Sequence, residues 1–213
     1  MKPEIYILGV GHNTALTIEL AEACGYRVAG LYHYCEGLTG QMVCGVEVMG
    51  THDNLLSEPN LQGRNFALSM GDNDIRASLF YRIKKKGGFL PPLVHPTCVI
   101  SRFAEIGEGS QLEAYCVVHA NSCIGENCNL QPYVLVCHNS TIGKHSFLAA
   151  KSIVGAYITV EHNAFIGMSA VLVSSKAELI GHHSIIGAGA VLTQNAEPSS
   201  TMVGVPAKLL KRK

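Results

Sequence analysis

The sequence predicts a chain of two parts: a small Rossmann-like α/β domain over residues 1–90 and an all-β helix of stacked coils over residues 91–213. Two observations carry this prediction. Strand, turn and helix patterns alternate in the first part, which is typical of a small parallel sheet covered by helices. In the second part, aliphatic residues recur every sixth position. A period of six fits neither an amphipathic helix nor a hairpin, but it fits a solenoid of short strands joined at repeated corners.

The period of six is unbroken over fourteen consecutive positions. Three such hexads would make one triangular coil, with the aliphatic side chain of each hexad pointing inward. After Leu172 the phase shifts by two residues, which predicts a small loop around residues 173–179. The fourteen positions are Val94, Ile100, Ile106, Leu112, Val118, Ile124, Leu130, Val136, Ile142, Leu148, Val154, Val160, Ile166 and Leu172.

A second column of residues lies four positions after each aliphatic residue and is small or β-branched. It includes Cys98, Cys116 and Cys128, so these thiols are expected to pack in the core. None of the eight cysteines forms a CxxC pair, which argues against a zinc ribbon. Reduced thiols, and no bound metal, are therefore expected.

Composition excludes several classes of protein. Sixteen basic residues balance sixteen acidic ones, so the chain lacks the basic field that binding to nucleic acid requires. An apolar share of 47% with only 15% charged residues argues against disorder, and no apolar run is long enough to span a membrane. Residues 1–9 lack a signal-peptide pattern, so a cytoplasmic location is expected.

The first part contains a recognisable order of elements. Strands are predicted over residues 4–8, 27–32 and 65–70, and helices over residues 13–24 and 74–85. Ligands of parallel sheets bind beyond the carboxyl ends of the strands. Gly9, Gly11 and His12 fall at one such end. The third glycine of a dinucleotide fingerprint is absent, so this segment is either a tight turn or a phosphate loop. At a second such end the sequence has Gly71, Asp72 and Asn73.

Taken together, these motifs resemble the hexapeptide-repeat sugar O- and N-acetyltransferases of the sialic-acid and bacillosamine type. The resemblance rests on Ile7–His12, on Gly71–Asn73 with Arg76, on Leu93–Pro96 at the start of the hexads, and on the ending Val203–Lys208. It implies that the β-helix is left-handed, an exception to the usual crossover rule. It also implies that acetyl-CoA donates an acetyl group to an amine or hydroxyl of a sugar, and that three copies form a trimer.

The resemblance also assigns the base that acyl transfer needs. His138 falls where the family has its catalytic histidine, but Asn139 replaces the acidic residue that follows it, and a second family histidine falls at Phe147. An asparagine can orient an imidazole by hydrogen bonding but cannot stabilise an imidazolium by charge. His145 and His162, which follows Glu161, are therefore possible substitutes.

The remaining implied site residues concern the two substrates. Binding of coenzyme A is implied for backbone groups and side chains at Gly155, Ala156, Gly187, Ala188, Pro206 and Lys208. Ala156 is expected to keep the N–H that holds the thioester. The family's acidic pair for the nucleotide base is replaced by residues 32–34, so Tyr32 is expected to stack on a base, unless the acceptor carries no nucleotide.

Two other functions stay open at this point. A metal-dependent hydratase of the carbonic-anhydrase kind would need histidines one or two coils apart, and no pair is spaced by 18 or 36 residues. A non-catalytic scaffold is the other alternative, because the base has lost its acidic partner.

Overall fold

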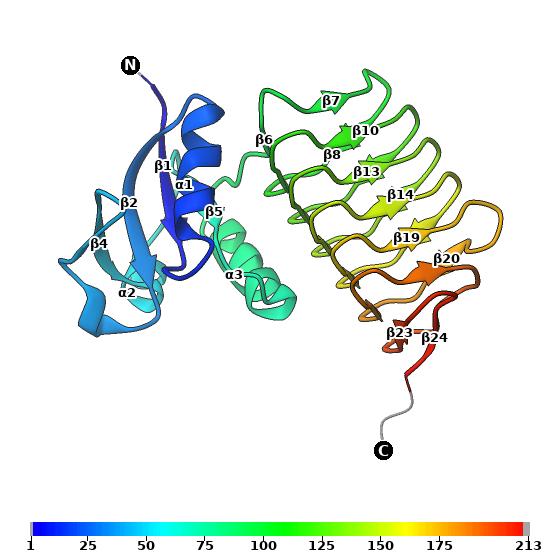
Figure 1. Cartoon of the computed structure of the whole chain (residues 1–213). Coiled ribbons are helices and arrows are strands. Elements are labelled where there is room, and N and C mark those ends of the chain that lie inside the picture. The colour runs from blue at the N-terminus through cyan, green and yellow to red at the C-terminus, as the bar shows by residue number, and fades with distance from the viewer. Residues whose placement is uncertain (1, 211–213) are drawn as a thin grey trace. The chain divides into compact units, whose positions relative to one another are not determined.

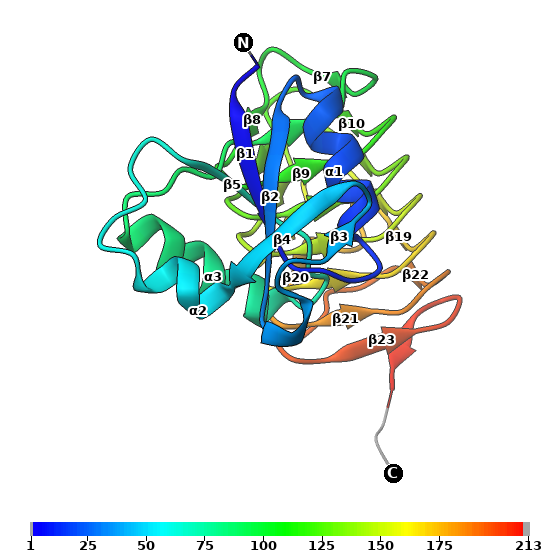
Figure 2. The same ribbon diagram turned by 90° about the vertical axis from the view of Figure 1, so that its left-hand side faces the viewer.

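The computed structural model describes residues 2–210, and they divide into two compact units, one ending at Leu93 and the other beginning at Val94. Each unit has its own hydrophobic core. Figures 1 and 2 show the elements of both units from two sides.

The first unit is built on a five-stranded sheet in the order β3-β4-β2-β1-β5. Strands β4, β2, β1 and β5 are parallel, and only β3 runs antiparallel to its neighbour β4. The elements are β1 (Glu4–Leu8), α1 (Thr14–Ala23), β2 (Arg27–His33), the 3-10 helix η1 (Glu36–Leu38), β3 (Met42–Val43), β4 (Val46–Thr51), α2 (His52–Ser57), β5 (Asn65–Leu68) and α3 (Asn73–Lys85).

Alternation along β1 distributes its side chains to two core layers. Ile5 and Ile7 join the cluster that contains residues of α1, whereas Leu8 joins the cluster that contains residues of α2 and α3. The sheet therefore lies between helix layers. The structure adds four elements that the sequence pattern did not predict, namely η1, β3, β4 and α2.

The second unit is a parallel β-helix in which each coil contributes one short strand to each of three sheets. Paired residues on successive coils are 18 positions apart, as in Leu135 with Ile153. The strands are β6 (Leu93–Val94), β7 (Val99–Ile100), β8 (Glu105–Ile106), β9 (Gln111–Leu112), β10 (Val117–Val118), β11 (Cys123–Ile124), β12 (Asn129–Leu130), β13 (Leu135–Val136), β14 (Thr141–Ile142), β15 (Phe147–Leu148), β16 (Ile153–Val154), β17 (Thr159–Val160), β18 (Phe165–Ile166), β19 (Val171–Leu172), β20 (Leu179–Ile180), β21 (Ile185–Ile186), β22 (Val191–Leu192), β23 (Thr201–Val203) and β24 (Lys208–Leu209).

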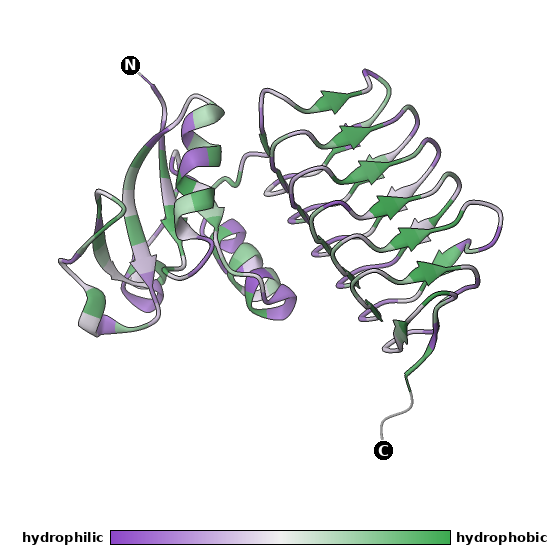
Figure 3. Cartoon of the chain, in the orientation of Figure 1, coloured by the Kyte–Doolittle hydropathy of each residue, from purple (hydrophilic) through white to green (hydrophobic). Residues whose placement is uncertain are grey.

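The aliphatic column of the sequence forms the interior of this β-helix. Leu112, Val136, Leu148 and Ile166 have no more than a trace of exposed surface. Hydrophobic residues follow the strands in Figure 3, and hydrophilic residues gather at the corners between them. The predicted loop is present between β19 and β20, where the spacing of paired residues rises from 18 to 20.

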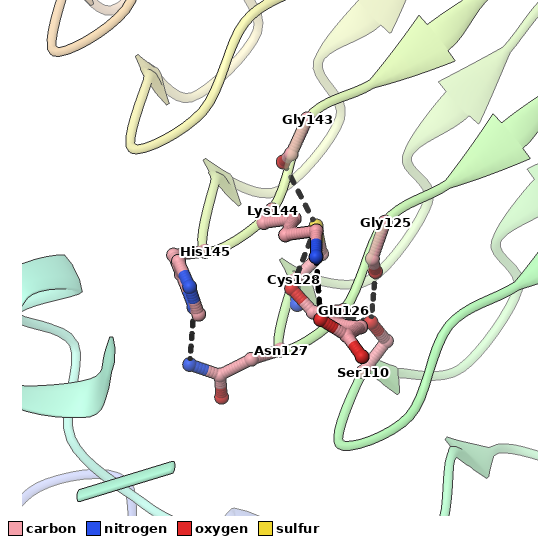
Figure 4. Close-up of polar contacts among 8 residues, drawn as sticks. All are labelled: Ser110, Gly125, Glu126, Asn127, Cys128, Gly143, Lys144 and His145. Atoms are coloured by element: carbon pink, nitrogen blue, oxygen red, sulfur yellow. Dashed lines mark hydrogen bonds and ion pairs between the residues drawn. The ribbon is translucent and has the colours of Figure 1, made fainter. Parts of the chain in front are cut away.

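Small polar residues close the corners from inside. The Ser110 hydroxyl donates to the carbonyl of Gly125 at 2.7 Å and accepts from the N–H of Cys128 at 3.0 Å. The Cys128 thiol repeats the first contact one coil later, with the carbonyl of Gly143 at 3.2 Å (Figure 4). The second sequence column therefore does more than fill space, because it pairs main-chain groups that a corner leaves unbonded.

Candidate active-site corner and nucleotide pocket

His138 lies at an exposed corner of the β-helix, two residues after β13. Ala156 and Ser174 occupy the same place after β16 and β19, because these strands stack at intervals of 18 residues. The three side chains therefore form a column on three successive coils. A candidate base therefore lies in the same corner column as the Ala156 main chain and the Ser174 hydroxyl.

The His138 ring is oriented by two contacts. Its Nδ1 lies 3.0 Å from Oδ1 of Asn139. Its ring also packs against the ring of Tyr157 in a T-shaped arrangement, with centroids 5.4 Å apart and planes at 90°. An amide oxygen can only accept, so in the neutral form of the ring this contact places the proton on Nδ1 and the lone pair on Nε2. Asn139 adopts a left-handed backbone (φ 60°), which asparagine tolerates better than most residues.

The Ala156 amide differs from the sequence-based expectation. The N–H was expected to be available to the thioester, but in the structure it donates to Oγ of Ser174 at 2.8 Å. The 18-residue spacing of these two positions could have revealed the contact in advance. A Cβ on the preceding Gly155 would lie only 2.5 Å from the same Oγ and 2.7 Å from the Leu172 carbonyl, so this corner requires glycine.

The other residues expected at the coenzyme lie near the end of the β-helix. The Gly187 N–H donates to the Met202 carbonyl at 2.8 Å, and Ala188 is exposed at the adjoining corner. Pro206 is exposed, and Lys208 lies in β24, paired with Val203 of β23. None of the contacts described between residues 2 and 210 joins this group to His138.

The substitutes considered for the base have structural partners. His145 is buried and its Nδ1 lies 2.8 Å from the amide nitrogen of Asn127, as Figure 4 shows. Phe147 stacks on Phe165 with centroids 5.3 Å apart. The exposed imidazole at position 138 is therefore the better candidate on this surface.

His162 stacks on His182, with ring centroids 5.0 Å apart and planes at 2°. The sequence arithmetic missed this pair because the two extra residues after Leu172 make the coil spacing 20 there. Within residues 2–210, no three His, Cys, Asp or Glu side chains are grouped so that they could hold a metal ion.

The first unit contains a cavity of about 340 Å³ at the carboxyl ends of β1, β2 and β5. This volume suits a small-molecule group. The sequence predicted this edge of the sheet, and four of the expected residues line the cavity. Its lining consists of Gly9, Val10, Gly11, His12, Asn13, His33, Tyr34, His52, Ser69, Met70, Gly71 and Ile75.

The glycine-containing segment is a tight turn and not an open phosphate loop. The Gly9 N–H donates to the Tyr32 carbonyl at 2.8 Å, that of Val10 to Nδ1 of His33 at 3.2 Å, and that of Gly11 to the Thr14 hydroxyl at 2.7 Å. These three donors are therefore used within the protein. Gly9 also has φ 108° and would place a Cβ 2.6 Å from the Ser69 hydroxyl, so no other residue fits there.

Tyr32 is not in the cavity, contrary to the expectation that it stacks on a ligand. It is buried, and its hydroxyl accepts from Nη2 of Arg64 at 3.2 Å. Burial raises its pKa. The exposed Tyr34, two residues along, lines the cavity instead. Residues two apart on a strand would share a face, but β2 ends at His33, so Tyr34 lies beyond the strand and leaves the direction that Tyr32 takes.

Asp72 and Asn73 shape the loop beside the cavity but do not line it. Oδ1 of Asp72 accepts from the N–H groups of Asp74 and Ile75 at 3.0 and 2.9 Å and so caps α3. Oδ1 of Asn73 accepts from the guanidinium of the buried Arg76 at 2.9 Å. Both residues therefore have structural roles in this fold.

Two buried histidines complete the cavity: His33, one of the residues 32–34 that replace the family's acidic pair, and His52, which the sequence did not single out. His33 ends β2, and His52 begins α2 and places its Nε2 3.2 Å from the Tyr32 carbonyl. The two rings meet edge to face at 78°, with centroids 6.3 Å apart. Burial lowers the pKa of each imidazole, so both are held neutral near pH 7. No sequence signal pointed to His52, which lies in a stretch without a clear pattern.

The fold of the second unit indicates a structural class. The sheets of stacked two-residue strands fit the left-handed β-helix, and residues 103–138 match the family described as bacterial transferase hexapeptide (six repeats).

Solved structures make the comparison more particular. The chain is 28% identical to a histidine-to-asparagine variant of perosamine N-acetyltransferase from Caulobacter crescentus in complex with CoA and GDP-perosamine, with a TM-score of 0.89 over 98% of this chain and 97% of that one. It is 25% identical to the acetyltransferase domain of PglB from Neisseria gonorrhoeae FA1090 in complex with acetyl coenzyme A, again with a TM-score of 0.89, over 99% and 100% of the two chains.

A third structure, WeeI from Acinetobacter baumannii AYE, shares the fold at 24% identity and a TM-score of 0.81, over 97% of this chain and 99% of that one. The resemblance to hexapeptide-repeat sugar acetyltransferases is confirmed by the matches to the perosamine and PglB enzymes together with the family match. None of the helices described over residues 2–210 combines the length and apolar character needed to cross a membrane.

Proposed function

We propose that this protein transfers the acetyl group of acetyl-CoA to an amine, or alternatively a hydroxyl, of a nucleotide-linked sugar. The observation that carries the proposal is the similarity over nearly the whole chain to sugar acetyltransferases solved with CoA or acetyl-CoA. That similarity includes both units, so it extends to the part that contains the cavity and not only to the β-helix.

In this proposal His138 is the general base. With its Nδ1 proton held by Asn139, its Nε2 accepts the proton of the sugar amine as the nitrogen attacks the thioester carbonyl. Nε2 of His138 then returns the proton to the departing thiolate of coenzyme A. Asn139 acts as the positioning residue, because its oxygen fixes the tautomer that leaves Nε2 free.

The oxyanion that develops on the thioester needs a hydrogen-bond donor. Ser174 Oγ accepts from the Ala156 N–H, so the proton of its own hydroxyl can turn outward toward a ligand. We propose that this pair replaces the lone Ala156 amide. The edge from Gly155 to Ala156 and the segments at Gly187, Ala188, Pro206 and Lys208 would hold coenzyme A, and the molecule would work as a homotrimer.

The cavity of the first unit would hold the nucleotide of the acceptor. Its place at the carboxyl ends of parallel strands is where such sheets bind ligands, and Tyr34 gives it an exposed aromatic face. The alternative is a non-catalytic scaffold, which is favoured by the loss of an acidic residue at position 139.

The test uses the full-length protein with acetyl-CoA and a panel of nucleotide-linked amino sugars, and it follows the release of free thiol. We expect turnover with at least one acceptor, and we expect His138→Ala to lower kcat by about 100-fold or more, the usual contribution of a general base. His183→Ala, at an exposed corner between β20 and β21, is the matched control and should leave the rate unchanged.

Two outcomes would contradict the proposal. Unchanged turnover in the His138 variant, with the fold retained by circular dichroism, would remove the base. No binding of acetyl-CoA in calorimetry would favour the scaffold instead.

A further inference from the structure

The contacts of His33 determine which of its ring nitrogens can donate. The Val10 N–H donates to Nδ1, so Nδ1 carries a lone pair. A neutral imidazole has one proton, which must then lie on Nε2. His33 lines the cavity, and its only described hydrogen bond uses Nδ1, so its Nε2–H remains available as a donor.

His52 has the opposite arrangement. Its Nε2 faces the Tyr32 carbonyl, which can only accept, so Nε2 carries the proton and Nδ1 keeps the lone pair. His52 lines the same cavity and also a second hollow beside Asp74 and Arg82. Its only described hydrogen bond uses Nε2, so Nδ1 remains available as an acceptor. The lowered pKa of both rings supports the neutral forms on which this assignment depends.

The cavity therefore offers one fixed donor and one fixed acceptor on neighbouring rings. Of the described residues that line it, none carries a carboxylate, an ammonium or a guanidinium group. Tyr34 packs against His33 with centroids 4.2 Å apart while most of its own surface stays exposed, so its ring is available for stacking. A flat, neutral ligand with adjacent hydrogen-bonding groups matches these features.

We propose that the cavity selects a nucleobase that presents a carbonyl beside a ring N–H, as guanine, hypoxanthine, uracil and thymine do. The carbonyl would accept from Nε2 of His33, the ring N–H would donate to Nδ1 of His52, and Tyr34 would stack on the base. This inference rests on the proposed function, because it takes the cavity to hold the nucleotide of the acceptor. Adenine would place an amino donor opposite the His33 donor and a ring acceptor opposite the His52 acceptor.

Inosine diphosphate and adenosine diphosphate are the decisive probes, since they differ only at this edge of the base. Calorimetry with the full chain should show inosine diphosphate binding at least about tenfold more tightly, because adenine leaves both histidine nitrogens unpaired. In His52→Phe the ratio should fall to within about threefold. Tyr34→Ala should weaken both ligands by a similar factor and leave the ratio unchanged, and His183→Phe, outside the cavity, should change neither.

Equal binding of the two diphosphates, tighter binding of adenosine diphosphate, or no binding of either would overturn the inference, as would a ratio that survives in His52→Phe. If that variant does not fold, N1-methyl inosine diphosphate tests the same contact in the natural chain and should bind at least about tenfold more weakly than inosine diphosphate. These measurements involve no acetyl-CoA. If the protein keeps its preference between the two nucleobases but transfers no acetyl group, only the catalytic proposal is contradicted.

Discussion

The two units treat buried polar groups in different ways. Inside the β-helix, the Ser140 hydroxyl donates to the Gly155 carbonyl at 2.8 Å and accepts from the Ile158 N–H at 3.2 Å, so it is used up by the main chain. In the first unit, the buried His33 and His52 each have one ring nitrogen bonded to the main chain and another left over. Not every buried hydroxyl of the β-helix is paired in this way, because Oγ of Ser152 and of Ser184 has no partner among the described residues. The difference that matters for function is one of place: the candidate base of the β-helix lies at an outer corner, whereas the histidines of the α/β unit line a cavity.

Alanine at Gly143 should have the largest effect, because it tests how tightly the coils pack. A Cβ there would lie 2.5 Å from main-chain atoms of both Glu161 and His162, which cannot move without breaking the next coil. We expect a loss of about 2 kcal/mol or more in the free energy of unfolding, measured in urea by circular dichroism.

Gly11→Ala is the matched substitution in the first unit. A Cβ at Gly11 would meet nothing within 4 Å, so we expect its stability to stay within about 1 kcal/mol of the original. Equal losses at the two glycines would show that coil spacing is not what limits Gly143.

Asn139 tests whether the corner chemistry depends on a fixed imidazole. Asn139→Ala removes the acceptor at 3.0 Å from Nδ1, so we expect kcat to fall about tenfold, which is the value of one modest hydrogen bond. Asn139→Asp keeps the acceptor and adds a negative charge, so the rate of this variant should equal or exceed that of the original protein. Steady-state rates of thiol release measure both, and a rate for Asn139→Ala equal to the original would remove the positioning role.

The smallest effect is expected from acid, and it should appear in the first unit. Burial lowers the pKa of His33 and His52, so the unfolded chain binds protons more readily than the folded one. Stability from these groups is therefore complete above the unfolded pKa of about 6.5 and decreases as the pH falls below it. The charges of Asp53 and Arg82 act on His52 in opposite directions and should partly offset one another.

Hydrogen exchange followed by mass spectrometry can locate this acid effect. Between pH 7 and pH 5.5 we expect protection to fall in β1 and β2 sooner than in β13 and β16, and the difference should shrink in His52→Phe. A loss of protection that begins in the β-helix would contradict the assignment.

The sequence predicted the β-helix well because each coil repeats the same constraints. The hexads, the inward residues and the shift after Leu172 are all present in the structure. They could be predicted because the same requirement for an inward aliphatic side chain recurs at every coil. It predicted the α/β unit less completely. Residues 42–57 form β3, β4 and α2 without a clear periodic pattern, and the aromatic residue at the cavity is Tyr34 instead of Tyr32.

Site residues divide in the same way. His138 is exposed in the structure, and whether it is the base stays a prediction. The contact of Ala156 with Ser174 follows from coil spacing, because the two residues are 18 positions apart. No spacing rule exists for His33 and His52, which come from a strand end and a helix start that the tertiary fold brings together.

The loop between β19 and β20 has a consequence for how such a chain can change length. It adds two residues, yet Thr159 pairs with Leu179 and Val171 with Val191, so strands on both sides keep their neighbours. A corner can thus absorb extra residues while the ladder of main-chain hydrogen bonds continues past it. The two extra residues also change which side chains stack on neighbouring coils, so that residues 20 positions apart meet, as His162 and His182 do.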